Sequence, residues 1–209
     1  MHSLFRIDSP AMRFLARVAD LMLLNVLILV FSIPIVTTGA ALSAAHHTAL
    51  KLRREEGHII SEFIRSFRTS FKQATGSWLI CLAVVAAVCL DLVLTRTLIT
   101  PLWIAIRTLL IAVAVLTCMV STWFFSLVAI IQNTFAAHLR NSFGLTLGYL
   151  PRSIMMALLY IAPWWISYWI PEIAILLLLF STSVPVYLST FFYLPVYKKM
   201  LSEEDSARL

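Results

Sequence analysis

Residues 51–73, KLRREEGHIISEFIRSFRTSFKQ, form the longest stretch of the chain that lacks a membrane-compatible segment, and they carry six of the sixteen Lys and Arg residues. From residue 59 onward the apolar residues recur at helical spacing and fall within an arc of about 140° at about 100° per residue. This apolar side consists of Ile59, Ile60, Phe63, Ile64, Phe67 and Phe71, and the opposite side carries Arg65, Arg68 and Lys72.

This pattern predicts an amphipathic helix over residues 59–72 that lies in the membrane surface. Its phenylalanine side chains would enter the acyl boundary, and its basic groups would face water, anionic lipid or a partner. A helix packed on a protein core is the alternative interpretation.

The composition indicates an integral membrane protein. Apolar residues make up 61% of the chain and charged residues 12%, whereas soluble domains average about 45–50% and about 25%. The positive-inside bias explains the net charge of +6 without nucleic-acid binding. Cys81, Cys89 and Cys118 lie singly within apolar segments, which indicates neither a disulfide framework nor a zinc site.

The apolar segments predict an all-α integral membrane protein, one domain over residues 1–209, with six transmembrane helices. The predicted spans are residues 14–33, 35–52, 77–95, 105–131, 153–170 and 173–197. A second amphipathic cytoplasmic interfacial helix is predicted over residues 133–148. Residues 35–52 are only weakly apolar, and five spans remain if this segment does not cross.

The distribution of basic residues favours six spans. With six, both termini are cytoplasmic and fourteen Lys and Arg residues lie inside, against Arg96 and Arg107 outside. With five, the division is eleven against five, and orientation follows such asymmetry. The six-span prediction puts an aromatic cluster at the outer interface, where such rings prefer to lie. The cluster is Trp164, Trp165, Tyr168 and Trp169.

Three segments resemble the YesL family of bacterial integral membrane proteins, a domain of unknown function. They are RVADL at residues 17–21 with Asn25, SIPIVTTGA at residues 32–40, and FIRSFRTSFKQAT at residues 63–75. That family is commonly associated by gene neighbourhood with carbohydrate ABC transporters. The resemblance implies a bacterial plasma-membrane protein that is accessory to sugar uptake, and it supplies no catalytic residues.

Polar residues inside the predicted spans are further site candidates, because ionisable groups in a bilayer are costly and mark pathways or pairs. The candidates are Asp20, Asn25, Thr37, Thr38, Asp91, Arg107, Ser181 and Thr182. Asp20 has Arg17 as a nearby partner, and Asp91 has Arg96 or Arg107. These pairs are the alternative to a direct functional role.

An amide within hydrocarbon must hydrogen-bond a neighbouring helix or broken backbone, so Asn25 is predicted to be structural, with the groups freed around Pro34 as partners. His46 and His47 point about 100° apart on a helix and do not converge on one metal ion. No metal site is predicted.

The chain lacks a phosphate-binding glycine loop, a nucleophile elbow and a zinc-protease motif. We therefore expect no enzymatic activity, no catalytic residue and no cofactor. One hypothesis is an accessory component that docks a partner, with ABC transporter subunits as the candidates, through residues 59–72. The other is a stand-alone small transporter or channel with a pathway lined by Asn25, Thr37, Thr38, Ser181 and Thr182. Both require a lipid bilayer, and a homo-oligomer is compatible with both.

Overall fold

The computed structural model describes residues 10–95 and 100–200, and the regular structure in these residues is helical. The helices are α1 (Pro10–Phe31), α2 (Thr38–Arg53), α3 (Ile59–Leu94), α4 (Pro101–Ile130), α5 (Phe135–Gly148), α6 (Leu150–Trp169), α7 (Ala174–Leu178) and α8 (Ser183–Met200), with short 3₁₀ helices η1 (Ile35–Thr37) and η2 (Pro171–Ile173). Arg6, Arg96 and Arg208, which enter the charge count, lie outside the described residues.

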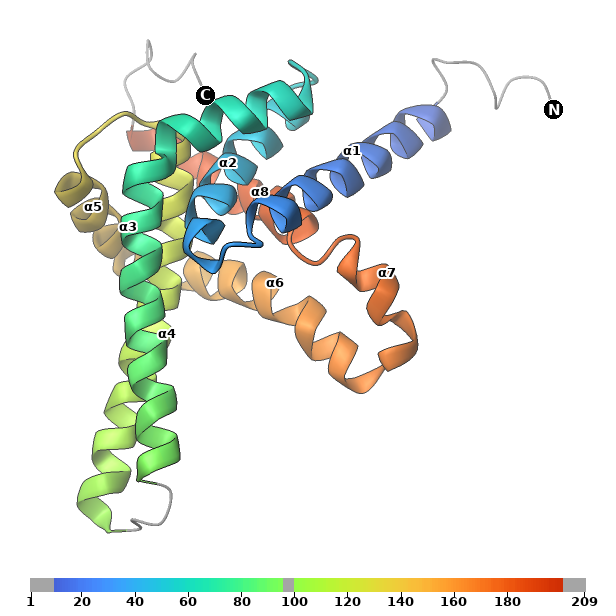
Figure 1. Ribbon diagram of the computed structural model, residues 1–209. Helices are drawn as coiled ribbons and strands as arrows, with labels where there is room; N and C mark the ends of the chain where they lie inside the picture. The colour runs from blue at the N-terminus through green and yellow to red at the C-terminus, as the bar shows by residue number, and fades with distance from the viewer. Residues whose placement is uncertain (1–9, 96–99, 201–209) are drawn as a thin grey trace.

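Helix α2 lies at the centre of the bundle, against α1, α3, α4 and α8 (Figure 1). Its many small residues are buried and let neighbouring backbones approach closely. The closest approach is at Gly39, where a Cβ would lie 2.5 Å from both the Ala74 carbonyl oxygen and the Trp78 Cβ. Glycine is therefore needed at this crossing of α2 and α3.

Helix α3 is one helix of 36 residues that contains both the predicted interfacial helix and the predicted span at residues 77–95. Figure 1 shows that its first part runs across one end of the molecule and then turns to run beside α4. The hydroxyls of Thr69 and Ser70 both donate to the Ser66 carbonyl oxygen, at 3.0 and 2.6 Å. Such bonds compete with the helical ladder and bend a helix without ending it.

Three of the described helices are long and apolar enough to cross a membrane, namely α1 from Ala11 onward, α3 and α4. Helices α5 and α6, bent by 102° relative to each other, make a fourth span if they act as one broken segment. This arrangement indicates a multi-pass integral membrane protein. The predicted six spans are not shown, because α2 has 16 residues and the last predicted span is interrupted.

The predicted span at residues 173–197 is divided into η2, α7 and α8. Pro185 lies just after this break and lacks an N–H, so it cannot donate to the carbonyl four residues earlier. The hydroxyl-bearing residues before it are Ser181, Thr182 and Ser183. The chain consequently turns here, and its polar backbone groups need other partners.

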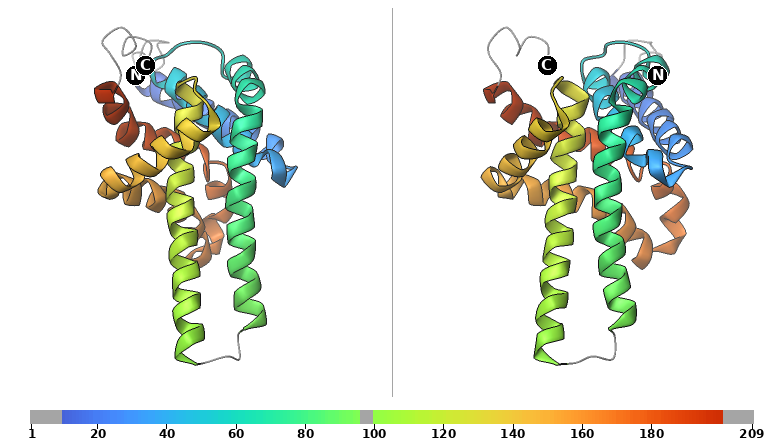
Figure 2. Two further views of the ribbon diagram at one scale, coloured as in Figure 1. Left: turned by 90° about the vertical axis from the view of Figure 1, so that its left-hand side faces the viewer. Right: turned by 60° about the vertical axis from the view of Figure 1, so that its left-hand side comes forward.

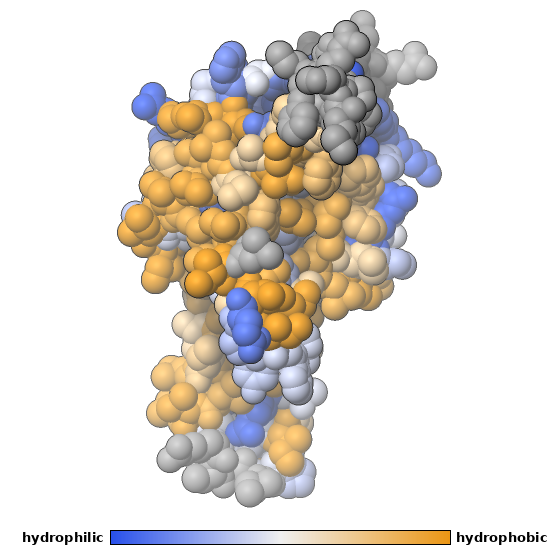
Figure 3. All heavy atoms as spheres, turned by 90° about the vertical axis from the view of Figure 1, so that its right-hand side faces the viewer, coloured by the Kyte–Doolittle hydropathy of each residue, from blue (hydrophilic) through white to orange (hydrophobic). Residues whose placement is uncertain are grey.

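The start of α1, the end of α8 and the α2–α3 connection lie toward one end of the molecule, and the end of α3 and the start of α4 lie at the other (Figures 1 and 2). Apolar side chains cover much of the face drawn in Figure 3. The aromatic cluster at the end of α6, which includes Trp164 and Trp169, is exposed. Apolar surface of this extent is typical of a protein that contacts lipid.

Candidate functional site

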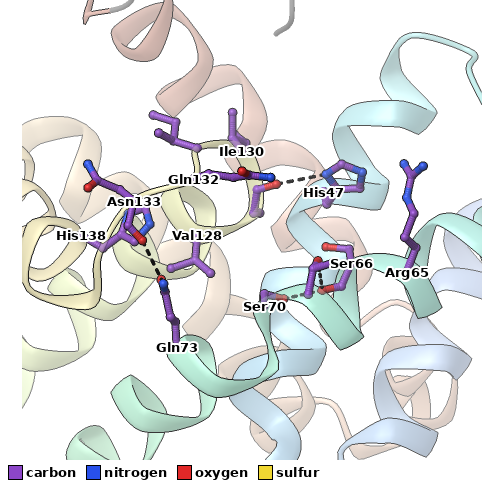
Figure 4. A pocket seen from close by; sticks show the side chains of 13 residues that line it. His47, Arg65, Ser66, Ser70, Gln73, Val128, Ile130, Gln132, Asn133 and His138 are labelled. Carbon is purple, nitrogen blue, oxygen red and sulfur yellow. Dashed lines mark hydrogen bonds between the residues drawn. The ribbon is translucent and has the colours of Figure 1, made fainter.

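A cavity of about 490 Å³ lies between α2, α3, the end of α4 and the start of α5 (Figure 4). Residues 131–134 between α4 and α5 are not helical and provide one of its walls. The lining residues are His47, Arg65, Ser66, Thr69, Ser70, Gln73, His138 and residues 128–133. Most of the side chains from α3 come from the segment that was predicted to be a basic surface helix.

The non-helical wall is fixed at both of its sides. The Thr134 hydroxyl caps α5 by accepting a hydrogen bond from the Ala137 N–H at 3.4 Å. Gln73 Nε2 on α3 donates to the Asn133 carbonyl oxygen at 2.9 Å. The Gln73 side-chain oxygen is buried and has no partner within residues 10–95 and 100–200. These bonds hold the α4–α5 segment across the cavity from α3.

His47 connects three helices. Its Nδ1 lies 3.1 Å from the Ala129 carbonyl oxygen on α4, and its Nε2 lies 3.2 Å from Glu62 Oε2 on α3. Carbonyl and carboxylate oxygens only accept hydrogen bonds, so these two contacts place acceptors at both ring nitrogens of His47. Glu62 also accepts a hydrogen bond from the Arg65 guanidinium. One carboxylate therefore contacts both His47 and Arg65.

His138 is buried at the wall formed by α5, with its ring 5.9 Å from that of Phe124. His138 therefore contributes an aromatic contact to this wall, and Arg65 supplies a positive charge at the cavity.

Arg65, Arg68 and Lys72 are all exposed on α3, and together they are called the basic face below. The Arg65 side chain keeps 63% of its surface exposed although it contacts Glu62. Arg68 and Lys72 have no ion-pair partner among the described residues.

The phenylalanine side of this segment differs from the expectation. Phe63 is 0% exposed and packs in a core formed mainly by α1 and α2, with its ring 5.4 Å from that of Phe31. Phe67 is half-buried with its ring 4.8 Å from that of Phe31. Phe71 remains 37% exposed. Phe63 and Phe67 therefore pack on protein and not in the acyl boundary, because α1 and α2 supply a core at this position.

Asn25 is completely buried and bridges the break between α7 and α8. Its Nδ2 donates to the Leu178 carbonyl oxygen at 2.7 Å, and its Oδ1 accepts from the N–H groups of Thr182 and Ser183, each at 3.0 Å. Asn25 thus caps the end of one helix and the start of the next. The partner is broken backbone, as expected in kind, but it lies near Pro185 and not near Pro34.

The other hydroxyl candidates near the broken segments also bond to local backbone. The Thr37 hydroxyl donates to the carbonyl oxygens of Phe31 and Pro34, at 2.6 and 2.8 Å, and so closes the turn after α1. Thr38 is the first residue of α2. The Ser181 hydroxyl donates to the Leu178 carbonyl oxygen at 3.3 Å. Asn25 and Ser181 therefore meet at the same carbonyl, whereas Thr37 serves a separate turn.

Asp20 lines a second cavity, of about 970 Å³, between α1, α2 and the start of α3. Its predicted partner Arg17 instead bonds to Glu55, with 2.5 Å between Nη2 and Oε1. Glu55 follows α2 with a φ of 60°, a backbone conformation that is uncommon for a residue other than glycine. The α2–α3 connection therefore brings this carboxylate to α1 and replaces Asp20 as the partner.

Asp91 and Arg107 meet near the tip of the α3–α4 hairpin. Their Oδ2 and Nε atoms are 3.7 Å apart. The Arg107 guanidinium also donates to the Thr95 carbonyl oxygen at 2.9 Å and to its hydroxyl at 3.1 Å. This geometry agrees with an ion pair that joins the two helices.

A buried polar network at the centre of the bundle was not predicted. His46 Nε2 lies 3.0 Å from the Tyr160 hydroxyl, and the Ser126 and Tyr197 hydroxyls are 2.6 Å apart. His46 and His47 occupy different surroundings, one in this network and one at the cavity. The only sequence signal was the presence of polar residues in apolar segments, which does not identify their partners.

A family model described as "Protein of unknown function, DUF624" matches residues 21–92. The match covers Asn25, His47 and the basic face, and it ends before α4. No curated protein and no solved structure matches the chain. The comparisons and the helices together describe a multi-pass membrane protein of unknown function whose residues 21–92 are similar to this family.

Proposed function

We propose that the protein is an accessory or regulatory component of a carbohydrate ABC transport system in a bacterial plasma membrane, and that it binds a transporter subunit through the basic face of α3. The observation that supports docking is the exposure of Arg65, Arg68 and Lys72 on one side of a helix whose other side is packed. The choice of a carbohydrate transport system rests on the resemblance to the YesL family.

The packing behind the basic face favours specific binding. Phe63 and Phe67 fix this part of α3 against α1 and α2. A binding surface that is already ordered loses less conformational freedom when a partner binds. Clustered exposed cations also accelerate the encounter with an acidic surface and select against basic ones. We therefore expect an acidic cytoplasmic surface on the partner.

The same proposal includes six membrane crossings with both termini in the cytoplasm. The basic face and the ends of the described chain would then share the cytoplasmic side. The common position of the α1 start, the α8 end and the α2–α3 connection supports this topology (Figures 1 and 2). The excess of basic residues on the proposed cytoplasmic side supports it independently.

Affinity purification from gently solubilised membranes tests the docking proposal. The protein should retain ABC transporter subunits, and the triple variant Arg65→Glu, Arg68→Glu, Lys72→Glu should lose about tenfold or more of them, because reversed charges repel an acidic partner. Arg140→Glu on α5 is the matched control, since it reverses an exposed charge outside the basic face. Equal recovery of the subunits with the triple variant and with the control rejects the docking proposal.

Flux measurements test the alternative of a stand-alone transporter or channel. In the folded chain the Asn25 amide is engaged with the α7–α8 break and does not offer free groups to a solute. We therefore expect no sugar or ion flux from the purified protein in liposomes. Flux that depends on the protein alone rejects the accessory role.

A further inference from the structure

We infer that the cavity between α2, α3 and the α4–α5 segment binds a phosphate group, supplied by the headgroup of an anionic phospholipid. This inference goes beyond the proposed function, because Arg68 and Lys72 lie outside the cavity and serve only the basic face. Arg65 belongs to both surfaces. The two ideas can therefore fail separately.

The charge of the cavity favours an anion. No carboxylate lines it among the described residues, whereas Arg65 does. Glu62 lines the second cavity instead and contacts both His47 and Arg65. The Arg65 side chain keeps 63% of its surface exposed beside Glu62, so its guanidinium can also contact an incoming phosphate.

Residues with unused hydrogen-bond donors also line this space. The Ser66 hydroxyl lines the cavity and has no hydrogen-bond partner within residues 10–95 and 100–200. The backbone N–H groups of Gln132 and Asn133, on the opposite wall, make no hydrogen bond within the same residues. Arg65 contacts Glu62 through one of its two terminal nitrogens, so the other is free to donate. Consecutive backbone N–H groups beside an arginine are a common arrangement for binding phosphate oxygens.

The surroundings favour a lipid as the source of the phosphate. The cavity lies where α4, a candidate membrane span, ends, which is the depth at which headgroups begin. Exposed apolar side chains adjoin it in sequence on both sides, with Phe71 next to Ser70 on α3 and Leu139 next to His138 on α5. Acyl chains can pack on these residues while the phosphate enters the cavity.

Native mass spectrometry of the full chain in detergent tests the inference, with phosphatidylglycerol, phosphatidylcholine and inorganic phosphate as separate probes. One phosphatidylglycerol should remain bound in preference to phosphatidylcholine. Arg65→Gln should weaken that binding about tenfold through loss of a charge-assisted hydrogen bond. Arg68→Gln is the matched control, because it removes the same charge from an exposed residue of α3 outside the cavity, and it should change binding less than about twofold.

A second variant tests the location without a change of charge. Thr69→Phe fills the cavity from an exposed residue of α3 and should also displace phosphatidylglycerol. Equal binding of both lipids, or equal effects of Arg65→Gln and Arg68→Gln, overturns the inference. Binding of inorganic phosphate without a preference for phosphatidylglycerol overturns the lipid as the source. Loss of the transporter subunits after Arg68→Glu alone, which lies outside the cavity, bears only on the basic face.

Discussion

Asn25 satisfies three backbone groups of a broken helix with one side chain. Asn25→Ala removes all three bonds within a buried region, and we expect the free energy of unfolding to fall by about 1–3 kcal/mol. Val26→Ala is the control, since this neighbouring side chain is exposed and should have little effect. Denaturant titration of the purified protein in mixed micelles measures both. Equal loss in the two variants contradicts the capping role.

Two glycines allow a comparison with opposite expected signs. A Cβ at Gly39 meets the backbone of α3 at 2.5 Å, whereas a Cβ at Gly144 in α5 meets nothing within 4 Å. Gly39→Ala should destabilise the protein by about 1–3 kcal/mol, because α2 and α3 must separate. Gly144→Ala should stabilise it by about 0.4–1 kcal/mol through reduced freedom of the unfolded chain. A stabilising Gly39→Ala would show that the helices cross elsewhere.

The sequence indicates which residues need a hydrogen-bonding partner, but it does not identify that partner. An amide in hydrocarbon needs hydrogen-bond partners, so a structural role was predicted for Asn25. The helix break that it caps, however, lies more than 150 residues away in the chain. The contacts of His47 with Glu62 and Ala129 were not predictable for the same reason, since they depend on how three helices pack.

At the scale of helices, the pairing of α3 with α4 places two cysteines side by side. The thiols of Cys81 on α3 and Cys118 on α4 are neighbours. Copper phenanthroline should therefore link Cys81 to Cys118 within one chain and leave one thiol of the three open to alkylation. Cys118→Ser should abolish the link and Cys89→Ser should preserve it. A link that includes Cys89 is incompatible with this helix pairing.

In α3 and in the last predicted span, the apolar pattern of the sequence predicts the structure only in part. Amphipathic periodicity correctly predicted a helix at residues 59–72, but it could not show that α1 and α2 cover Phe63, or that the helix continues unbroken to Leu94. In the last segment, high apolar content suggested one span, whereas Pro185 and its preceding hydroxyl residues mark the observed division into α7 and α8. Local composition describes each segment alone, and tertiary contacts decide its ends.

Both proposed binding surfaces depend on the side of the membrane on which the basic face lies. The composition and three candidate spans indicate a multi-pass protein. The proposed docking and the inferred phosphate site both require the α2–α3 connection and the α4–α5 segment to lie in the cytoplasm. An even number of crossings, with both termini on that side, is the simplest topology that meets this requirement.

Paired reporter fusions measure this topology directly in living cells, with alkaline phosphatase active only outside and green fluorescent protein fluorescent only inside. We expect fluorescence and no phosphatase activity from fusions at each end of the chain, and phosphatase activity from an insertion at Thr100, beside the α3–α4 connection. If the fusions at the two ends report opposite sides of the membrane, or if the insertion at Thr100 reports the cytoplasm, the proposed topology is wrong. The proposal that the basic face binds a cytoplasmic partner is then wrong as well.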